Sequence, residues 1–233
     1  MFRTPFGYWL WWTLLAFSCL IAWDASGLDL PVARLFGTSE GFALRDNWLL
    51  VKVMHQDAKT FSWILVIVLF VAVAWPASFF RSLERSDRLQ LALSIVAAVL
   101  AVTLLKQRSH TSCPWDLDAF GGVARYVSHW RWAGRDGGPG HCFPAGHASA
   151  GFSFLAGYFV VARRLPRLAR WWLFGSLASG LILGLVQQLR GAHYASHTLW
   201  TGWVCWVTGL LIDFARTHWR IRAGKPSPGS AAS

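Results

Sequence analysis

Six long apolar runs constrain the fold of this chain more than any other feature of its sequence. They cover residues 7–23, 61–80, 89–105, 146–162, 171–187 and 198–215. An α-helix needs roughly 20 apolar residues to cross the hydrocarbon core of a bilayer, with about 17 at the lower limit. The sequence therefore predicts an all-α, polytopic membrane protein, built as a bundle of six transmembrane helices.

The composition supports lipid as the solvent of this chain. Hydrophobic residues make up 55% and charged residues only 14%, whereas about 25% of a typical soluble domain is charged. The formal charge of +11 raises the question of nucleic acid. The basic residues separate apolar runs instead of forming one basic face, so we exclude nucleic acid and expect membrane lipids as partners.

The distribution of Lys and Arg predicts the orientation in the membrane. Twelve of the 22 lie in short segments: the N-terminus, residues 81–88, residues 163–170 and the tail from 216. The positive-inside rule then places both termini in the cytoplasm of a bacterial inner-membrane protein. The segments expected to face the periplasm are 24–60, 106–145 and 188–197.

The chain is expected to form one membrane domain, residues 1–215, followed by a tail. The tail, residues 216–233, is basic and ends in small residues, Pro and Gly, which predicts a disordered cytoplasmic segment. Residues 46–59 have apolar positions at mixed helical spacing, which predicts an amphipathic helix on the membrane surface.

Three polar clusters adjoin the predicted helices: residues 106–116, 142–149 and 190–197. The predicted topology places all three at the same face of the membrane. Lys and Arg side chains neutralise phosphate, and a helix that starts after Pro-Ala-Gly-His offers N–H groups to an anion. Two histidines suit phosphoryl transfer without a metal, because one can attack phosphorus while the other protonates the leaving oxygen.

These clusters resemble the signature of the type 2 phosphatidic acid phosphatase (PAP2) superfamily. That signature is Lys-x6-Arg-Pro, then Pro-Ser-Gly-His, then Ser-Arg-x5-His-x3-Asp. The matching motifs lie within 106–201, and the resemblance covers roughly residues 89–215. It implies a lipid phosphatase that forms a phosphohistidine and needs no metal or other cofactor. Isoprenyl diphosphate, lipid A phosphate, phosphatidylglycerol phosphate and phosphatidic acid are all candidate substrates.

The resemblance assigns roles residue by residue. Lys106 matches the lysine of the first motif, which implies phosphate binding. Gly146 and His147 match the second motif, so His147 is the implied general acid, and the amides of Ala145 and Gly146 are expected to bind phosphate. His193 lies in Gly-Ala-His-Tyr-Ala-Ser, similar to the family's Gly-x-His-Tyr-x-Ser, and is the implied nucleophile.

Four positions depart from the family pattern. Cys113 stands where the first motif has Arg, and Ala145 where the second has Ser. In the third motif, Gln187 stands where the family has Arg, and His197 where it has the Asp that orients the nucleophile. The site therefore lacks two phosphate-binding arginines and one carboxylate.

We hypothesise that nearby residues compensate for these losses. Arg108 and Arg190 would supply the missing positive charge from shifted positions. His197 follows His193 by four residues and shares its helix face, so a neutral His197 would accept the N–H of the nucleophile. A competing register pairs Arg190 with His197 as the nucleophile, and it requires one extra intervening residue.

Cys113 and Cys142 both fall in a segment predicted to face an oxidising compartment. A disulfide between them would tie the first motif to the second. Two free thiols are the alternative.

The sequence thus predicts a membrane lipid phosphatase with its site at the periplasmic face. A lipid-to-lipid phosphotransferase and a non-catalytic lipid-binding or transport relative remain as alternatives. Neither the substrate lipid nor the oligomeric state is predicted.

Overall fold

The computed structural model of the chain describes residues 6–130 and 134–223. Its long helices are α1 (Phe6–Ser26), α3 (Ala58–Ala74), α4 (Arg85–Gln107), α7 (Pro166–Leu189) and α8 (Ala195–Arg222). The shorter helical segments are α2 (Asp29–Ala33), η1 (Leu49–Asp57), η2 (Ser78–Ser82), η3 (Pro114–Asp116), η4 (Asp118–Phe120), α5 (Ser149–Phe152), η5 (Ser153–Gly157) and α6 (Tyr158–Arg164). Strands β1 (Gly37–Thr38) and β2 (Gly41–Phe42) pair as one antiparallel hairpin. The prediction of a mostly helical protein is confirmed.

Five helical stretches among the described residues are long and apolar enough to cross a membrane: α1, the continuous stretch Leu49–Ala74, α4, α7 and α8. They indicate a multi-pass membrane protein. The fourth apolar run, 146–162, does not form one long helix. It is divided into α5, η5 and α6, and its first residues, 146–148, belong to the loop that precedes α5. Of the six predicted transmembrane helices, five correspond to long helices among the described residues, and the fourth corresponds to these short segments.

Two predicted boundaries need correction. Residues 46–59 do not form a separate surface helix, because η1 runs directly into α3 and extends that helix to 26 residues. The tail predicted from 216 begins as helix, since α8 continues through Arg222. The guanidinium of Arg216 lies 2.7 Å from the carboxylate of Asp87, which holds the start of the tail against α4. Residues 224–233 lie outside the described part of the chain.

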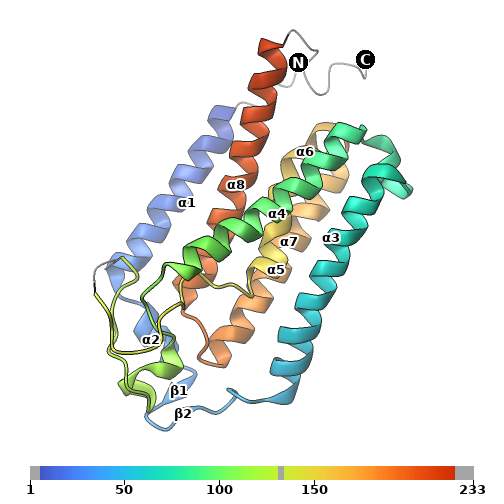
Figure 1. Cartoon of the computed structure of the whole chain (residues 1–233). Helices are drawn as coiled ribbons and strands as arrows, with labels where there is room; N and C mark the ends of the chain where they lie inside the picture. The colour runs from blue at the N-terminus through green and yellow to red at the C-terminus, as the bar shows by residue number, and fades with distance from the viewer. Residues whose placement is uncertain (1–5, 131–133, 224–233) are drawn as a thin grey trace.

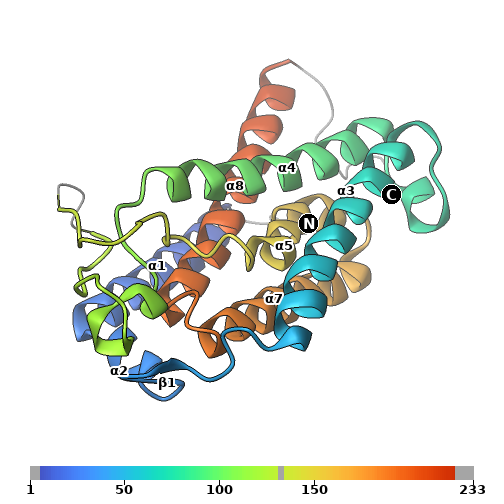
Figure 2. The same cartoon turned by 60° about the horizontal axis from the view of Figure 1, so that its bottom comes forward.

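The helices run between two distinct ends of the molecule. The start of α1 and the end of α8 lie at one end, and α2, the β1–β2 hairpin and the segments 108–130 and 134–148 gather at the other (Figures 1 and 2). α8 packs against α1, α4 and α7, and α5 contacts α4, α7 and α8. The end of α4, the loop before α5 and the start of α8 therefore meet, which brings the three polar clusters together.

Glycine permits the closest helix contacts in the interior. A Cβ on Gly151 of α5 would lie 2.4 Å from the backbone N of Gly180 in α7. A Cβ on Gly209 of α8 would lie 2.4 Å from the Cα of Ala156 in η5. Small residues let helix backbones approach each other in membrane bundles. These contacts fix α5 and η5 between α7 and α8.

A buried cluster of charges joins three helices at the end opposite the loops. Arg163 of α6 pairs with Asp87 of α4 at 3.3 Å and also with Asp213 of α8. Arg216 of α8 pairs with Asp87 from the other side. Removing one partner from a buried ion pair costs about 3–5 kcal/mol, so this cluster stabilises the contacts of α4, α6 and α8.

Candidate active site

A cavity of about 360 Å³ lies between α3, α4, α5 and α7. Val66 and Val96 contribute to its apolar wall, and Lys106, Gly146 and His147 line its polar part. The volume falls within the range of about 300–1,000 Å³ that is usual for ligand pockets. The cavity thus joins the walls of membrane-length helices to residues of the first and second polar clusters.

Lys106 and Gly146 are in direct contact. Lys106 lies in the last turn of α4. A Cβ on Gly146 would lie 3.4 Å from Cδ of Lys106, so the aliphatic part of the lysine passes over this glycine. The contact brings the charged end of Lys106 to the loop before α5, so its positive charge acts on the polar part of the cavity.

The loop before α5 offers fewer free backbone N–H groups for binding phosphate than the sequence predicted. The N–H of Ala145 donates to the carbonyl of His197 at 3.2 Å, and Ala145 is fully buried. No backbone hydrogen bond among the described residues uses the N–H of Gly146. The predicted phosphate contact of Ala145 is therefore not available in this conformation, and Ala145 instead joins the second cluster to the third.

A disulfide between Cys113 and Cys142 fixes the long segment between α4 and α5. Their Cα atoms lie 5.2 Å apart, and the pairing is the one expected from the sequence. Next to it, the N–H of Cys142 donates to the carbonyl of Thr111 at 2.9 Å. The two halves of the segment therefore lie side by side, and the loop that precedes His147 is held close to the end of α4.

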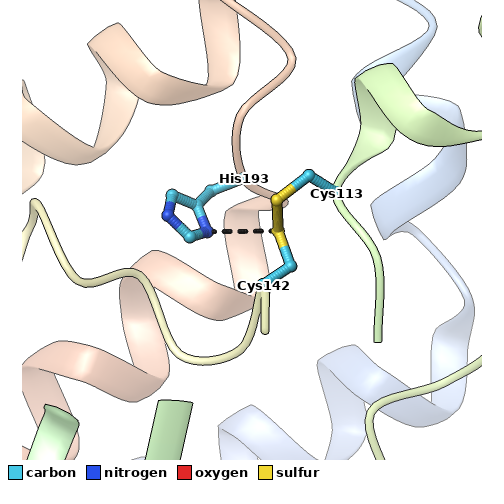
Figure 3. A group of neighbouring side chains, drawn as sticks. All are labelled: Cys113, Cys142 and His193. Carbon is cyan, nitrogen blue, oxygen red and sulfur yellow. Dashed lines mark hydrogen bonds between the residues drawn. A yellow bond between two sulfur atoms is a disulfide. The ribbon is translucent and has the colours of Figure 1, made fainter. Parts of the chain in front are cut away.

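His193 lies in the turn between α7 and α8, beside this disulfide (Figure 3). Its Nδ1 is 3.5 Å from Sγ of Cys142. A disulfide sulfur can accept a hydrogen bond but has no hydrogen to donate, so this contact places the proton on Nδ1. The lone pair is then on Nε2, which points away from the disulfide (Figure 3). This tautomer leaves Nε2 available as a nucleophile.

The surroundings of His193 keep its ring neutral. The residue is 4% exposed and does not belong to the cavity lining that the structure describes. Burial lowers the pKa of His193 well below its usual range, and the neighbouring Lys106, His197 and His147 lower it further. The same interactions show that Lys106 and His147 lie close enough to act on His193 electrostatically. A neutral imidazole is the form that can attack phosphorus.

His197 is positioned by the same cysteine. Its Nδ1 lies 3.1 Å from the carbonyl oxygen of Cys142, and a carbonyl only accepts, so this nitrogen carries the proton. The ring centroids of His193 and His197 are 5.8 Å apart. The acceptor that faces Nδ1 of His193 is Cys142 Sγ, not the imidazole of His197 as hypothesised. Cys142 therefore orients both rings, one through its sulfur and one through its carbonyl.

The two arginines expected to replace the missing ones lie away from the cavity. In Arg190, Nε donates to the carbonyl of Arg45 at 2.9 Å and a terminal nitrogen donates to Oε1 of Gln187 at 3.2 Å. Arg108 is exposed and lines a separate, small hollow beside Phe143. This geometry does not support their predicted contact with phosphate. Arg190 anchors the loop around Arg45, because that carbonyl lies within reach and the cavity does not.

Lys59 is a residue of the cavity that the sequence did not single out, whereas Gln187 is one of the four departures from the family pattern. Lys59 of α3 lines the cavity. A lysine at the end of an apolar run is usually an interface anchor, so nothing in the sequence marked Lys59 as part of the site. Gln187 is 1% exposed, and its Nε2 has no hydrogen-bond partner among the described residues. It occupies the position of the arginine in the third motif.

The fold and the site together define a membrane protein with several helices that can span a bilayer, and with a cavity lined by Lys106, Gly146 and His147 at its polar part. The sequence model of the PAP2 superfamily matches residues 87–220, which is more than half of the chain. The protein belongs to the PAP2 superfamily, whose members are generally phosphatases that act on phosphate esters. No curated protein and no solved structure matches the chain.

Proposed function

We propose that this protein hydrolyses the phosphate ester or diphosphate of a lipid through a phosphohistidine at His193. The observation that carries the proposal is the shape of the cavity. Its apolar wall comes from helices long enough to cross a membrane, and its polar part holds Lys106, Gly146 and His147. A substrate with a hydrocarbon chain and a phosphate headgroup matches both parts.

The proposed reaction has two steps. Nε2 of His193 attacks phosphorus while the bond to the leaving oxygen breaks, and His147 donates a proton to that oxygen. Water then attacks the phosphohistidine, the P–N bond breaks, and His147 takes the proton of the water. Lys106 and the N–H of Gly146 stabilise the charge on the phosphoryl oxygens in both steps. No step requires a metal.

Charge and disulfide both favour a site on the periplasmic side of an inner membrane. The arginine-rich end, which includes Arg163 and Arg216, lies opposite the cavity loops. The positive-inside rule assigns that end to the cytoplasm. The disulfide between Cys113 and Cys142 at the other end fits an oxidising compartment.

The proposal is tested by phosphate release from purified protein, in detergent and in vesicles, with the four candidate lipid phosphates. The wild type should release phosphate from at least one of them. His193→Ala should abolish release, and His147→Ala should slow it roughly 10²–10⁴-fold. His110→Ala changes an exposed histidine and should leave the rate unchanged.

Three outcomes contradict the proposal in different ways. Release that survives His193→Ala would exclude His193 as the nucleophile and point to the register with His197. Absence of release from every lipid would exclude the enzyme and favour a non-catalytic lipid-binding relative. Transfer of labelled phosphate to a second lipid would identify a phosphotransferase instead of a hydrolase.

A further inference from the structure

A second cluster of ionisable side chains lies outside the cavity, where α1 ends, α2 begins and the segment 126–129 passes. One carboxylate oxygen from Asp24, one from Asp29 and one ring nitrogen of His129 all lie within 4.8 Å of one another. Tyr126 and Ser128 line the same small hollow. None of these residues takes part in the proposed reaction.

The cluster places two carboxylates together with little access to solvent. The side chains of Asp24 and His129 are each 5% exposed, and Asp29 is 5% exposed. Buried carboxylates this close repel each other and require a compensating positive charge. Oδ1 of Asp24 and Nε2 of His129 have no hydrogen-bond partner among the described residues, although Nε2 lies 3.3 Å from Oδ2 of Asp24. Oδ1 of Asp24 is therefore open to a further ligand, and Nε2 of His129 offers its lone pair to the same ligand when the ring is neutral with its proton on Nδ1.

Other hydrogen bonds hold the two carboxylates in place from outside. The indole N–H groups of Trp130 and Trp200 donate to Oδ2 of Asp24 at 2.9 and 2.8 Å. The backbone N–H of Ser196 donates to Oδ1 of Asp29 at 3.0 Å, and its hydroxyl donates to Oδ2. Metal ligands in proteins are oriented by outer hydrogen bonds of this kind.

We propose that Asp24, Asp29 and His129 bind a structural divalent cation, for which Zn²⁺ is the best match. One imidazole nitrogen and two carboxylate oxygens suit Zn²⁺, with water as a fourth ligand. The ion neutralises the paired carboxylates and joins α1, α2 and the segment 126–129. Because Asp29 also caps the first turn of α8 through Ser196, the ion stabilises the helix start that follows His193. The site is separate from the phosphate cavity and adds no step to the reaction.

The test uses the full chain with a tag free of histidine, purified in detergent without reductant so that the disulfide stays intact. The protein is stripped with EDTA and titrated with Zn²⁺, and bound metal is measured by mass spectrometry together with the Tm. The wild type should bind about one ion per chain, with a rise in Tm as the ion binds the folded state. Asp29→Asn and His129→Gln should each weaken binding at least about 10-fold, the loss that even outer-shell changes cause.

Two matched controls locate the ion. His110→Gln changes an exposed histidine at the same end and should bind Zn²⁺ as the wild type does. The double variant Cys113→Ala/Cys142→Ala should also keep the ion, which excludes binding by thiols near His193. Asp24→Asn provides a second ligand variant if one of the others fails to fold. The proposal is overturned if the wild type shows no saturable binding, or if His110→Gln loses as much affinity as His129→Gln.

Discussion

The residue that most distinguishes this site is Cys142, which faces the proposed nucleophile where a carboxylate is expected. Its sulfur accepts from Nδ1 of His193 and its carbonyl accepts from Nδ1 of His197. A disulfide sulfur is uncharged and a weak acceptor. It can fix the tautomer of His193, but it stabilises positive charge on the ring less than an aspartate would.

The disulfide has two proposed roles: it links two segments covalently, and its Cys142 sulfur accepts a hydrogen bond from His193. The variants Cys142→Ala and Cys113→Ala separate these roles. Both variants break the covalent link, but only Cys142→Ala removes the sulfur from His193. We expect kcat for phosphate release to be about 10-fold lower in Cys142→Ala than in Cys113→Ala, which corresponds to about 1.4 kcal/mol for one hydrogen bond. Equal losses of kcat would show that the disulfide acts only as a structural link.

Lys59 of α3 and Lys106 of α4 both line the cavity, so we expect Lys59 to bind the substrate phosphate as well. Lys59→Met should raise KM about 10–100-fold, because a hydrogen bond to a charged group contributes about 1.5–3 kcal/mol, with a smaller effect on kcat. The matched control is Lys52→Met, since Lys52 is exposed and lies 3.9 Å from Asp57. Unchanged KM in Lys59→Met would show that this lysine serves only as an interface anchor.

At the scale of elements, the segmented helix α5–η5–α6 depends on close contact with its neighbours. Its pieces are too short to be stable alone, since isolated helices below about 12–15 residues are marginal. Gly151 brings α5 against the backbone of α7 at Gly180, and Gly209 brings α8 against η5. The position of His147, just before α5, therefore depends on tertiary packing more than on local helix propensity.

Substitution of one glycine tests this contact. Gly151→Ala would place a Cβ 2.4 Å from the backbone N of Gly180, and the overpacking should lower the free energy of unfolding by about 1–3 kcal/mol. Gly175→Ala on α7 is the control, because a Cβ there meets nothing within 4 Å. That variant should be neutral or more stable by up to about 1 kcal/mol. Thermal unfolding in detergent measures both, and an equal Tm for the two variants would contradict the close contact.

At the scale of the whole molecule, the two ends differ in their chemistry. One end is fixed by the ion pairs of Asp87 with Arg163 and Arg216. The other end is held by the disulfide between Cys113 and Cys142, and it buries the neutral rings of His193 and His197. The second end is therefore the one whose stability should respond to mild acid, because its buried imidazole has to gain a charge.

The pH dependence of stability follows from the lowered pKa of His193. The unfolded chain binds a proton at His193 near pH 6.5, whereas the folded protein binds it only at lower pH. Stability is therefore intact above about pH 6.5 and falls as pH decreases below that value, by at most about 1.4 kcal/mol per pH unit for this group. His193→Gln should flatten the decline of Tm between about pH 6.5 and 5. An unchanged slope would show that His193 is protonated equally in both states.

The sequence predicted some of these features correctly because they follow from order along the chain. Successive membrane helices run in opposite directions. The polar clusters after the third apolar run, before the fourth run and before the sixth run therefore lie at the same end of the molecule. The pairing of Cys113 with Cys142 followed from the prediction that both face the same oxidising compartment. The sequence did not correctly predict the side-chain positions of Arg108 and Arg190. The direction of a long side chain depends on acceptors elsewhere in the fold, and for Arg190 that acceptor is the carbonyl of Arg45.

By itself, the sequence determined that the chain is apolar enough for a membrane, that its polar clusters share one end, and which residues resemble a PAP2 site. These properties depend on composition, period and spacing, which are local. Only the tertiary structure decided that the N–H of Ala145 donates to the carbonyl of His197 and that Cys142 faces His193. The same holds for the cluster of Asp24, Asp29 and His129. These contacts join segments far apart in the chain, and their geometry is set by how the helices pack.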